Sequence, residues 1–336
     1  ISGSNTYSGI TSLLAGTTVI TQSTAFGNSS LVNMNNDGPV LDVGANNLTI
    51  TNDFFIRNNG PDARVILFGL TGANSATFTG QFTVNEATQR DFIINVGEDD
   101  TLTLSGPIIT TAGGGAGIRK LGDGTLIVSN TGNDYLGRTE IVGGTFQLDG
   151  NHINGDNYVL SPGTFLTGTG STTSAVISAG GTISPGVTTG DVTDDVGTGD
   201  FTLNSATNLN IDLGGTTEGT DYDQLDVIGS VDLNSDANVG GGAMLNLSLV
   251  GGFTPTVGDT FIIVDNDDAD AITTTFRTTD DDRGLVELPE GSAFTAGGQV
   301  YTITYQGGTG NDVVLTAEGA AETEVTIDAN GNLVIT

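Results

Sequence analysis

The densest group of side chains able to bind a ligand is acidic. It consists of Asp265, Asp267, Asp268 and Asp270. Several carboxylates on one short loop supply the oxygen ligands that a hard cation such as calcium prefers. The glycine and the distal glutamate of an EF-hand loop are missing, so the spacing specifies no known calcium loop. Two interpretations stay open: a weak calcium site at 265–270, and a solvated loop of an acidic protein.

A second candidate calcium ligand is Asp312. Residues 307–315, GGTGNDVVL, match the calcium-binding nonapeptide GGxGxDxUx. That motif binds calcium when tandem copies stack, because consecutive turns share each ion, and this chain has one copy. The flanking alternating runs 301–305 and 313–315 predict a hairpin around the GGTGND turn. A third acidic run, 280–282, allows the same two interpretations as 265–270.

The cationic residues give little support for catalysis. Only eight Lys and Arg are present, and the sole histidine, His152, lies in a polar stretch that predicts an exposed corner. Polysaccharide lyases and glycosidases need a cation beside metal-bound acids or one carboxyl group with a raised pKa. Lys120 and Arg119 lie inside a repeated motif, where a structural role is expected. The sequence predicts that the protein is not an enzyme, and a glycan-cleaving activity is the alternative.

Composition narrows the fold and the partners. The chain has 336 residues, 52 of them glycine, and 36% hydrophobic against 14% charged residues. Helical periodicity is absent, so an all-β fold is expected. A formal net charge of −32 repels nucleic acid and anionic membrane surfaces. There is no cysteine and no apolar run long enough to predict membrane insertion.

Residues 117–148 contain three short runs rich in Thr and branched aliphatics, 125–128, 139–142 and 145–148, separated by glycine turns. The second half of this phrase occurs again at the N-terminus. Its shared positions are Asn5, Tyr7, Gly9, Thr11, Gly16 and Thr17, which recur as Asn133, Tyr135, Gly137, Thr139, Gly144 and Thr145. The displacement is a constant 128 residues, as from Tyr7 to Tyr135. Repetition of short strands and glycine corners predicts a β-solenoid.

Aromatic residues recur at one position of the repeat. Tyr7 and Tyr135 are equivalent, and Phe78 takes the same place in a weaker copy. We expect these rings to stack from repeat to repeat, since a repeated position faces its own copies. Stacking on carbohydrate is the alternative.

The motifs are specific enough to indicate a family. They comprise Ile118, Lys120, Gly122, Gly124, Thr125 and Leu126, then the Asn133–Thr145 phrase, 166–170, 181–186, 221–225, 258–261 and 305–315. This pattern resembles the autotransporter-associated β-strand repeat family over most of residues 1–317. The resemblance implies a right-handed parallel β-helix in a bacterial protein that is secreted or displayed on the cell surface, as a stalk, adhesin or matrix component. The family contributes no catalytic residues.

Three regions are expected: β-helix repeats at 1–187, their continuation with a closing hairpin at 188–317, and an acidic linker with a terminal hairpin or arm at 318–336. Residues 188–200 are predicted to leave the helix as a surface excursion, and 261–264 to form a central strand. Asn330-Gly331 between two alternating runs is a strong hairpin signal. Because the chain opens inside a motif and closes in a strand-like run, a piece of a longer protein or a processed product is expected.

The leading functional hypothesis is therefore a non-enzymatic extracellular structural module. Its expected partners are copies of itself, head to tail through residues 325–336, or neighbouring modules of a longer chain, because solenoid ends expose strand edges. Binding of cell-surface glycans is the alternative function.

Overall fold

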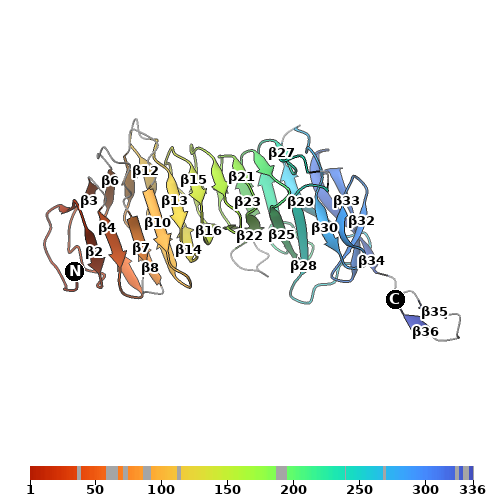
Figure 1. Ribbon diagram of the computed structural model, residues 1–336, viewed down its shortest axis with the longest axis horizontal. Helices are drawn as coiled ribbons and strands as arrows, with labels where there is room; N and C mark the ends of the chain where they lie inside the picture. Colours follow the sequence, from red (N-terminus) through yellow and green to blue (C-terminus); the bar gives the residue numbers. More distant parts are fainter. Residues whose placement is uncertain are drawn as a thin grey trace.

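The computed structural model describes residues 1–35, 39–57, 67–70, 75–85, 92–111, 115–186, 195–238, 240–267, 270–321, 325–327 and 333–335. These residues contain strands and turns and no helix, which confirms the all-β prediction. They form an elongated body with the N-terminus at one end and a terminal hairpin beyond the other (Figure 1).

Four long sheets, A to D, make up this body, and their members are given in spatial order. Sheet A contains β1 (Thr11–Leu13), β3 (Val32–Asn35), β6 (Phe54–Arg57), β9 (Phe82–Val84) and β12 (Ile108–Thr110). Sheet B contains β2 (Thr17–Ile20), β4 (Val40–Val43), β7 (Leu67–Leu70), β10 (Phe92–Val96), β13 (Ile118–Leu121), β15 (Thr139–Ile141), β18 (Tyr158–Leu160), β21 (Val176–Ser178), β24 (Phe201–Leu203) and β27 (Val231–Asp232).

Sheet C forms a further side of the body, whereas sheet D continues the side of sheet A, since isolated parallel bridges join Ile109 to Asp134 and Asn133 to His152. Sheet C contains β31 (Gly284–Glu287), β30 (Arg277–Asp280), β28 (Met244–Leu249), β25 (Asn208–Leu213), β22 (Thr182–Pro185), β19 (Phe165–Gly168), β16 (Thr145–Leu148), β14 (Thr125–Val128), β11 (Thr101–Leu104), β8 (Ser75–Phe78) and β5 (Leu48–Ile50). Sheet D contains β17 (Asn151–His152), β20 (Ser171–Thr172), β23 (Asp195–Thr198), β26 (Gln224–Val227), β29 (Thr260–Asn266), β34 (Asp312–Ala320), β33 (Gln299–Gly307) and β32 (Ala293–Ala296). We call each stretch of chain that passes once around these sheets a coil.

Alternation of apolar and polar residues explains why these segments are strands. In β11 the sequence Thr-Leu-Thr-Leu points Leu102 and Leu104 into the body and leaves the two threonines at the surface. Parallel register then places Leu126 of the next coil beside Leu102, and Phe146 of the coil after that beside Leu126. The inward residues of successive described coils therefore form mainly apolar columns along the body.

Phenylalanines fill the interior of the N-terminal half. Phe54 and Phe82 are stacked with ring centroids 4.9 Å apart, and Phe78, Phe26 and Phe92 contact this pair. Phe78, expected to stack on its repeat copies, instead contacts rings at other repeat positions. Aromatic packing here follows proximity between adjacent coils and not repeat number.

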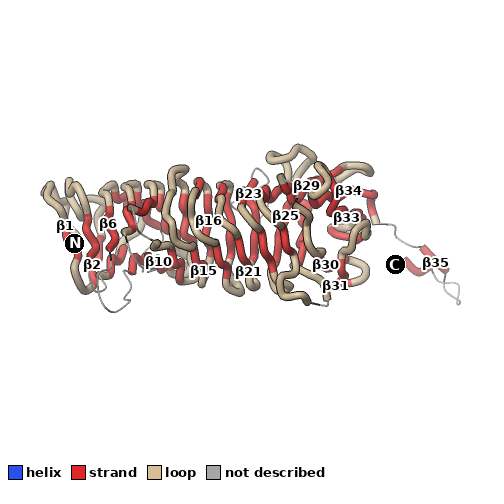
Figure 2. Tube along the Cα trace, turned by 90° about the horizontal axis from the view of Figure 1, so that it is seen from above, coloured by secondary structure: helices blue, strands red, loops and turns tan. Residues whose placement is uncertain are grey.

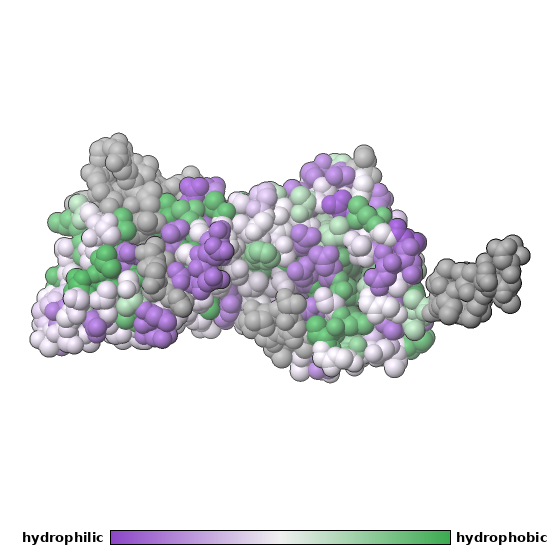
Figure 3. Space-filling model, turned by 60° about the horizontal axis from the view of Figure 1, so that its bottom comes forward, coloured by the Kyte–Doolittle hydropathy of each residue, from purple (hydrophilic) through white to green (hydrophobic). Residues whose placement is uncertain are grey.

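Coil length varies along the body. Register partners in sheet B are as close in sequence as residues 158 and 176 in the middle, and as far apart as 201 and 231 further on. A shorter coil encloses a smaller cross-section, and the space-filling view shows a body that is thinner in its middle than at either end (Figure 3).

The C-terminal end is built differently, because its strands turn antiparallel. In sheet D, β29, β34, β33 and β32 pair antiparallel, which confirms the predicted hairpin around residues 307–312. Phe261, Ile263 and Val264 of β29 are buried, as expected for a central strand. We call this antiparallel region, residues 277–320, the cap.

Two predictions about connections are wrong. Residues 195–198, expected in a surface excursion, form β23 between β20 and β26, whereas residues 188–194 of that excursion lie outside the described residues. Residues 318–320, expected in an acidic linker, extend β34, since Ala320 pairs with Gln299 of β33. Backbone pairing with the neighbouring strand outweighs the loop-like composition of both segments.

The terminal hairpin is confirmed as a pair of strands. β35 (Val325–Ile327) pairs antiparallel with β36 (Leu333–Ile335), while its Asn-Gly turn lies outside the described residues. The hairpin is separate from the cap in two views (Figures 1 and 2).

The internal repeat falls on different sides of the body. The phrase that forms β1 and β2 belongs to sheets A and B, whereas its copy 128 residues later forms β15 and β16 in sheets B and C. The repeated residues form strands in both copies, as predicted. The second copy, however, lies one side further around the body than the first.

Close contact between coils makes one glycine testable. A β-carbon on Gly106 would lie 1.9 Å from the carbonyl oxygen of Gly80 in the preceding coil. We expect Gly106→Ala to destabilise the protein by at least about 1–3 kcal/mol, because two backbones would have to separate. Gly115→Ala, which meets no atom within 4 Å, is the matched control. Equal denaturant midpoints for the two variants would contradict this packing.

Candidate functional site

The predicted acidic site is brought together only in part. Asp265 and Asp312 lie on neighbouring strands, where Val264 pairs with Val313, and the Asp312 carboxylate contributes to the raised pKa of Asp265. Asp267 is exposed, Asp270 contributes its main-chain oxygen to the local hydrogen bonds, and Asp268 lies outside the described residues. The described residues contain no group of three or more histidine, cysteine, aspartate or glutamate side chains arranged to hold a metal ion. Calcium at these residues stays a prediction.

Asp312 acts within the hairpin that carries it. Its carboxylate accepts hydrogen bonds from the backbone N–H groups of Asn266 and Thr309, both at 3.0 Å. The side-chain amides of Asn266 and Asn311 donate to the carbonyl oxygen of Asp270, at 2.7 and 3.1 Å. The nonapeptide-like turn is therefore fastened to the end of β29 directly by the Asn266–Asp312 bond and indirectly through the Asp270 carbonyl oxygen, while the Thr309–Asp312 bond lies within the turn.

Next to this turn lies an acidic hollow of about 280 Å³, lined by Ser171, Asp226, Val227, Ile228, Asp265 and Asp267. Parallel register places Asp226 directly beside Asp265 on adjacent strands. Burial raises the pKa of Asp265, and the neighbouring Asp312 and Glu218 carboxylates raise it further. The hollow thus favours cations or neutral groups over anions.

The acidic run 280–282 has a structural role at Asp280. Its buried carboxylate accepts hydrogen bonds from the Arg283 side chain, at 2.7 and 3.1 Å, and from the backbone N–H of Thr295 at 2.9 Å. Burial raises the pKa of Asp280, but the Arg283 and backbone hydrogen bonds outweigh it and hold the pKa at about 2. Asp280 therefore connects the β30–β31 turn to β32.

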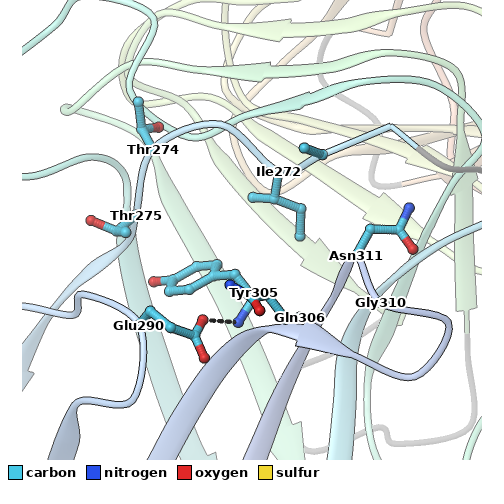
Figure 4. A pocket seen from close by; sticks show the side chains of 9 residues that line it. Ile272, Thr274, Thr275, Glu290, Tyr305, Gln306, Gly310 and Asn311 are labelled. Carbon is cyan, nitrogen blue, oxygen red and sulfur yellow. Dashed lines mark hydrogen bonds between the residues drawn. The ribbon is translucent and has the colours of Figure 1, made fainter.

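A larger hollow, of about 420 Å³, opens at the side of the cap. It is lined by Ala271, Ile272, Thr274, Thr275, Glu290, Tyr305, Gln306, Gly310 and Asn311, which come from three separate segments (Figure 4). Thr274 adopts a φ of 68°, a conformation that β-branched residues rarely take. The lining combines an aromatic ring and an aliphatic side chain with hydroxyl, amide and carboxylate groups.

Some polar groups of this cap hollow already form hydrogen bonds within the protein, and others do not. Glu290 accepts hydrogen bonds from Thr304 Oγ1 at 2.6 Å and from the Tyr305 backbone N–H at 2.7 Å. The Tyr305 hydroxyl donates to Leu288 O at 2.8 Å and accepts from the Phe276 N–H at 2.9 Å. The side-chain amide of Gln306 is exposed and bonds to none of the residues that the structure describes. Gln306 is thus the lining group best placed to meet a ligand.

His152 corrects a prediction, because it is fully buried and not an exposed corner residue. Its ring stacks on Tyr135 with centroids 3.7 Å apart. Its Nε2 donates to the Tyr135 carbonyl oxygen at 2.8 Å, so Nδ1 accepts from the Tyr158 hydroxyl at 3.0 Å. Burial lowers the pKa of His152 to about 4. It fills the interior where the coils are shortest, and it offers no exposed base.

Lys120 is also directed inward, in an apolar column between Ile94 and Ile141. Its ammonium group reaches the corner of the coil and donates to the carbonyl oxygens of Leu121, Gly122 and Gly143, at 3.1, 2.7 and 2.9 Å. Burial lowers the pKa of Lys120 to about 8. The expectation of a structural role in the repeat agrees with these contacts, which join two successive corners. Arg119, its neighbour, forms a surface ion pair with Glu140 at 3.1 Å.

The cap hollow was missed by sequence reasoning. Its lining residues lie between positions 271 and 311 and carry no spaced motif, so only the fold brings the segment before the cap together with the cap. The one available signal was the nonapeptide-like turn, which contributes Gly310 and Asn311 to the rim.

Comparison with known proteins relates part of the chain to a bacterial adhesin. No protein-family model matches the chain. The chain is 31% identical over 188 residues to the adhesin BmaC autotransporter of Brucella suis biovar 1 (strain 1330). The match covers 52% of this chain and 5% of that adhesin. The chain is therefore similar to a small part of a bacterial autotransporter adhesin.

The similarity to this adhesin supports a sequence relationship between this chain and autotransporter proteins, as the repeat motifs indicated. No helix in the described part of the chain is long and apolar enough to cross a membrane.

The buried histidine predicts a pH dependence of stability. Because the pKa of His152 falls from 6.5 to about 4 on folding, its contribution is complete above pH 6.5 and is lost as the pH falls towards 4, since the unfolded chain gains the proton before the folded chain does. We expect the stability of the parent, relative to His152→Gln, to decline by roughly 3 kcal/mol between pH 7 and pH 4.

Denaturant unfolding of both proteins at several pH values measures this difference. The carboxylates titrate in both and cancel in the comparison. Parallel pH profiles for the two proteins would show that His152 is not shielded as described.

Proposed function

We propose that this chain is a non-enzymatic structural module of a bacterial surface or secreted protein, built as a right-handed parallel β-helix and acting as an adhesin-like stalk or fibre segment. The observation that supports it most is the long parallel stack with one continuous apolar interior. Such a stack gains length with each added coil while every coil contacts only its neighbours. The similarity to part of an autotransporter adhesin points the same way.

The environment of the titratable groups supports a non-catalytic role. The lysine and the histidine with the largest pKa changes are enclosed and bonded to backbone or tyrosine groups. A general acid or base must reach its substrate within hydrogen-bond distance. Neither Lys120 nor His152 offers that access in the described structure.

The strongly negative net charge of the chain supports an extracellular location. With a net charge of −32, the chain is best tolerated where salt or divalent ions screen it. The same charge disfavours nucleic acid and anionic lipid as partners.

Glycan binding is the second candidate, and the cap hollow favours it. Neutral sugars are recognised by an apolar wall together with a few hydrogen-bonding groups, and the hollow offers Tyr305 and Ile272 beside Gln306, Glu290 and Thr275. Under this reading the stalk carries a lectin-like site near one end.

One experiment separates the candidates. The chain is incubated with neutral and acidic polysaccharides, and both retained glycan and new reducing or unsaturated ends are measured. The structural proposal expects no turnover, and any enzyme-dependent release of ends would overturn it. Binding that is lost in Gln306→Ala, and kept in the exposed control Gln22→Ala, would establish the glycan site.

Head-to-tail association through the terminal hairpin belongs to the same proposal. β35 and β36 pair with each other, which leaves both outer edges of this two-stranded sheet available for another strand. Deleting residues 323–336 should therefore convert assemblies into monomers in light-scattering chromatography. A parent protein that is already monomeric, or assemblies that survive the deletion, would contradict strand donation.

A further inference from the structure

The cap hollow contains a fixed negative charge. Glu290 accepts hydrogen bonds from Thr304 Oγ1 at 2.6 Å and from the Tyr305 backbone N–H at 2.7 Å, one on each carboxylate oxygen. These two bonds position the carboxylate at the edge of the hollow and leave further lone pairs on both oxygens. A carboxylate held in this way is complementary to a cationic ligand, because hydrogen bonds between two ionised groups are the strong ones.

No cationic side chain of the cap balances this charge. Arg277 and Arg283 are the only lysine or arginine residues after position 138 in the sequence. The Arg283 guanidinium bonds to Asp280 at 2.7 Å, and the Arg277 guanidinium donates to the carbonyl oxygen of Ser205. Ion pairs in the described part of the chain do not involve Glu290. The net charge of −32 adds a field that attracts cations to the same place.

The wall beside Glu290 is apolar although it contains a tyrosine. The Tyr305 hydroxyl already donates to Leu288 O at 2.8 Å and accepts from the Phe276 N–H at 2.9 Å. Burial raises the pKa of Tyr305, with a smaller contribution from Glu290, so the hydroxyl stays neutral. The aromatic ring and the half-buried Ile272 therefore offer apolar surface to a ligand (Figure 4). An aromatic ring also attracts a nearby cation.

Two polar side chains of the lining remain available for hydroxyl groups of a ligand. Gln306 is exposed and Thr275 is half-buried, and neither side chain bonds to a residue that the structure describes. An amide and a hydroxyl can each donate and accept. The single ammonium group of a lysine side chain would leave both of them unmatched. The lining therefore favours a ligand that combines one cationic group with several hydroxyl groups.

The size and the backbone of the hollow agree with a binding site. Its volume of about 420 Å³ lies in the range of pockets that hold small ligands. Thr274 in its lining has a φ of 68°, which is unfavourable for a β-branched residue. Such strained conformations cluster at ligand-binding and catalytic sites, where the surrounding structure imposes them.

We propose that the cap hollow binds a sugar that carries a free amino group. The ammonium group pairs with Glu290, the apolar face of the sugar ring lies against Tyr305 and Ile272, and the sugar hydroxyl groups bond to Gln306 and Thr275. A neutral sugar would cover the Glu290 carboxylate without balancing its charge, and an acidic sugar would add a like charge. This inference names the substrate class of the glycan-binding candidate and rests on it, whereas the structural role does not depend on it.

Single sugars test the amino group without the multivalent attraction of a polycation to an acidic protein. Binding of glucosamine, N-acetylglucosamine and glucose to the full chain is measured by saturation-transfer NMR at pH 6, where the amine is protonated. 1,5-Diaminopentane serves as an amine without a sugar ring. We expect glucosamine to bind at least about tenfold more tightly than the two neutral sugars, because only its ammonium group forms a charge-assisted bond with Glu290.

Two matched variants locate the effect. Glu290→Gln removes the charge from the hollow with little change of shape, and we expect it to abolish the preference for glucosamine. Glu287→Gln removes the same charge from an exposed position of β31 and should keep the preference. Equal binding of the three sugars, a preference that survives Glu290→Gln, or a diamine that binds as tightly as glucosamine would overturn the proposal.

The failures of this inference and of the proposed function are distinguishable. Neutral-sugar binding that depends on Gln306 but shows no preference for the amine overturns the substrate class and leaves the glycan candidate standing. Absence of all sugar binding overturns both. Neither result bears on the structural role, which is tested by the absence of turnover.

Discussion

Parallel backbone pairing between successive coils is the interaction on which the rest of the structure depends. It fixes adjacent coils about 4.8 Å apart and places each inward side chain directly on its partners in the coils before and after. The choice of side chain at an inward position is therefore constrained by the side chains at the same position in the adjacent coils. Leu102, Leu126 and Phe146 satisfy the constraint as one apolar column, and Gly106 satisfies it because any side chain would separate two backbones.

The same constraint governs the polar groups that lie inside. Lys120 occupies an apolar column, and its charge is tolerable because the ammonium group reaches three carbonyl oxygens at the glycine corners. His152 takes the complementary solution, a neutral ring with both nitrogens bonded. At the C-terminal end the parallel pattern gives way to antiparallel strands, and Asp280 and Asp312 use their carboxylates to fasten the turns of that cap. Much of the acidity that suggested metal binding is thus engaged in closing loops.

Local signals carried much of the fold. Alternation in Thr101–Leu104, the glycine-rich turn at 307–312 and the Asn-Gly pair near the terminus each encode their element within a few residues. Features that depend on which strands pair with one another could not be predicted from the sequence alone. β17 has two residues, too few to show that His152 points inward, and the extension of β34 to Ala320 depends on its partner strand. The cap hollow could not be predicted, because its lining is gathered from three segments that only the fold brings together.

The displacement of the repeated phrase from sheets A and B to sheets B and C has a consequence for how such chains grow. Its 128 residues correspond to five coils plus one side, and yet the stack continues without a break. The sides of the body are therefore interchangeable as hosts for the same phrase. Duplication of such a phrase does not have to add whole coils, because this chain accommodates a copy displaced by one side of the body. Insertions of unequal length then change the girth and the outward pattern while the interior columns persist.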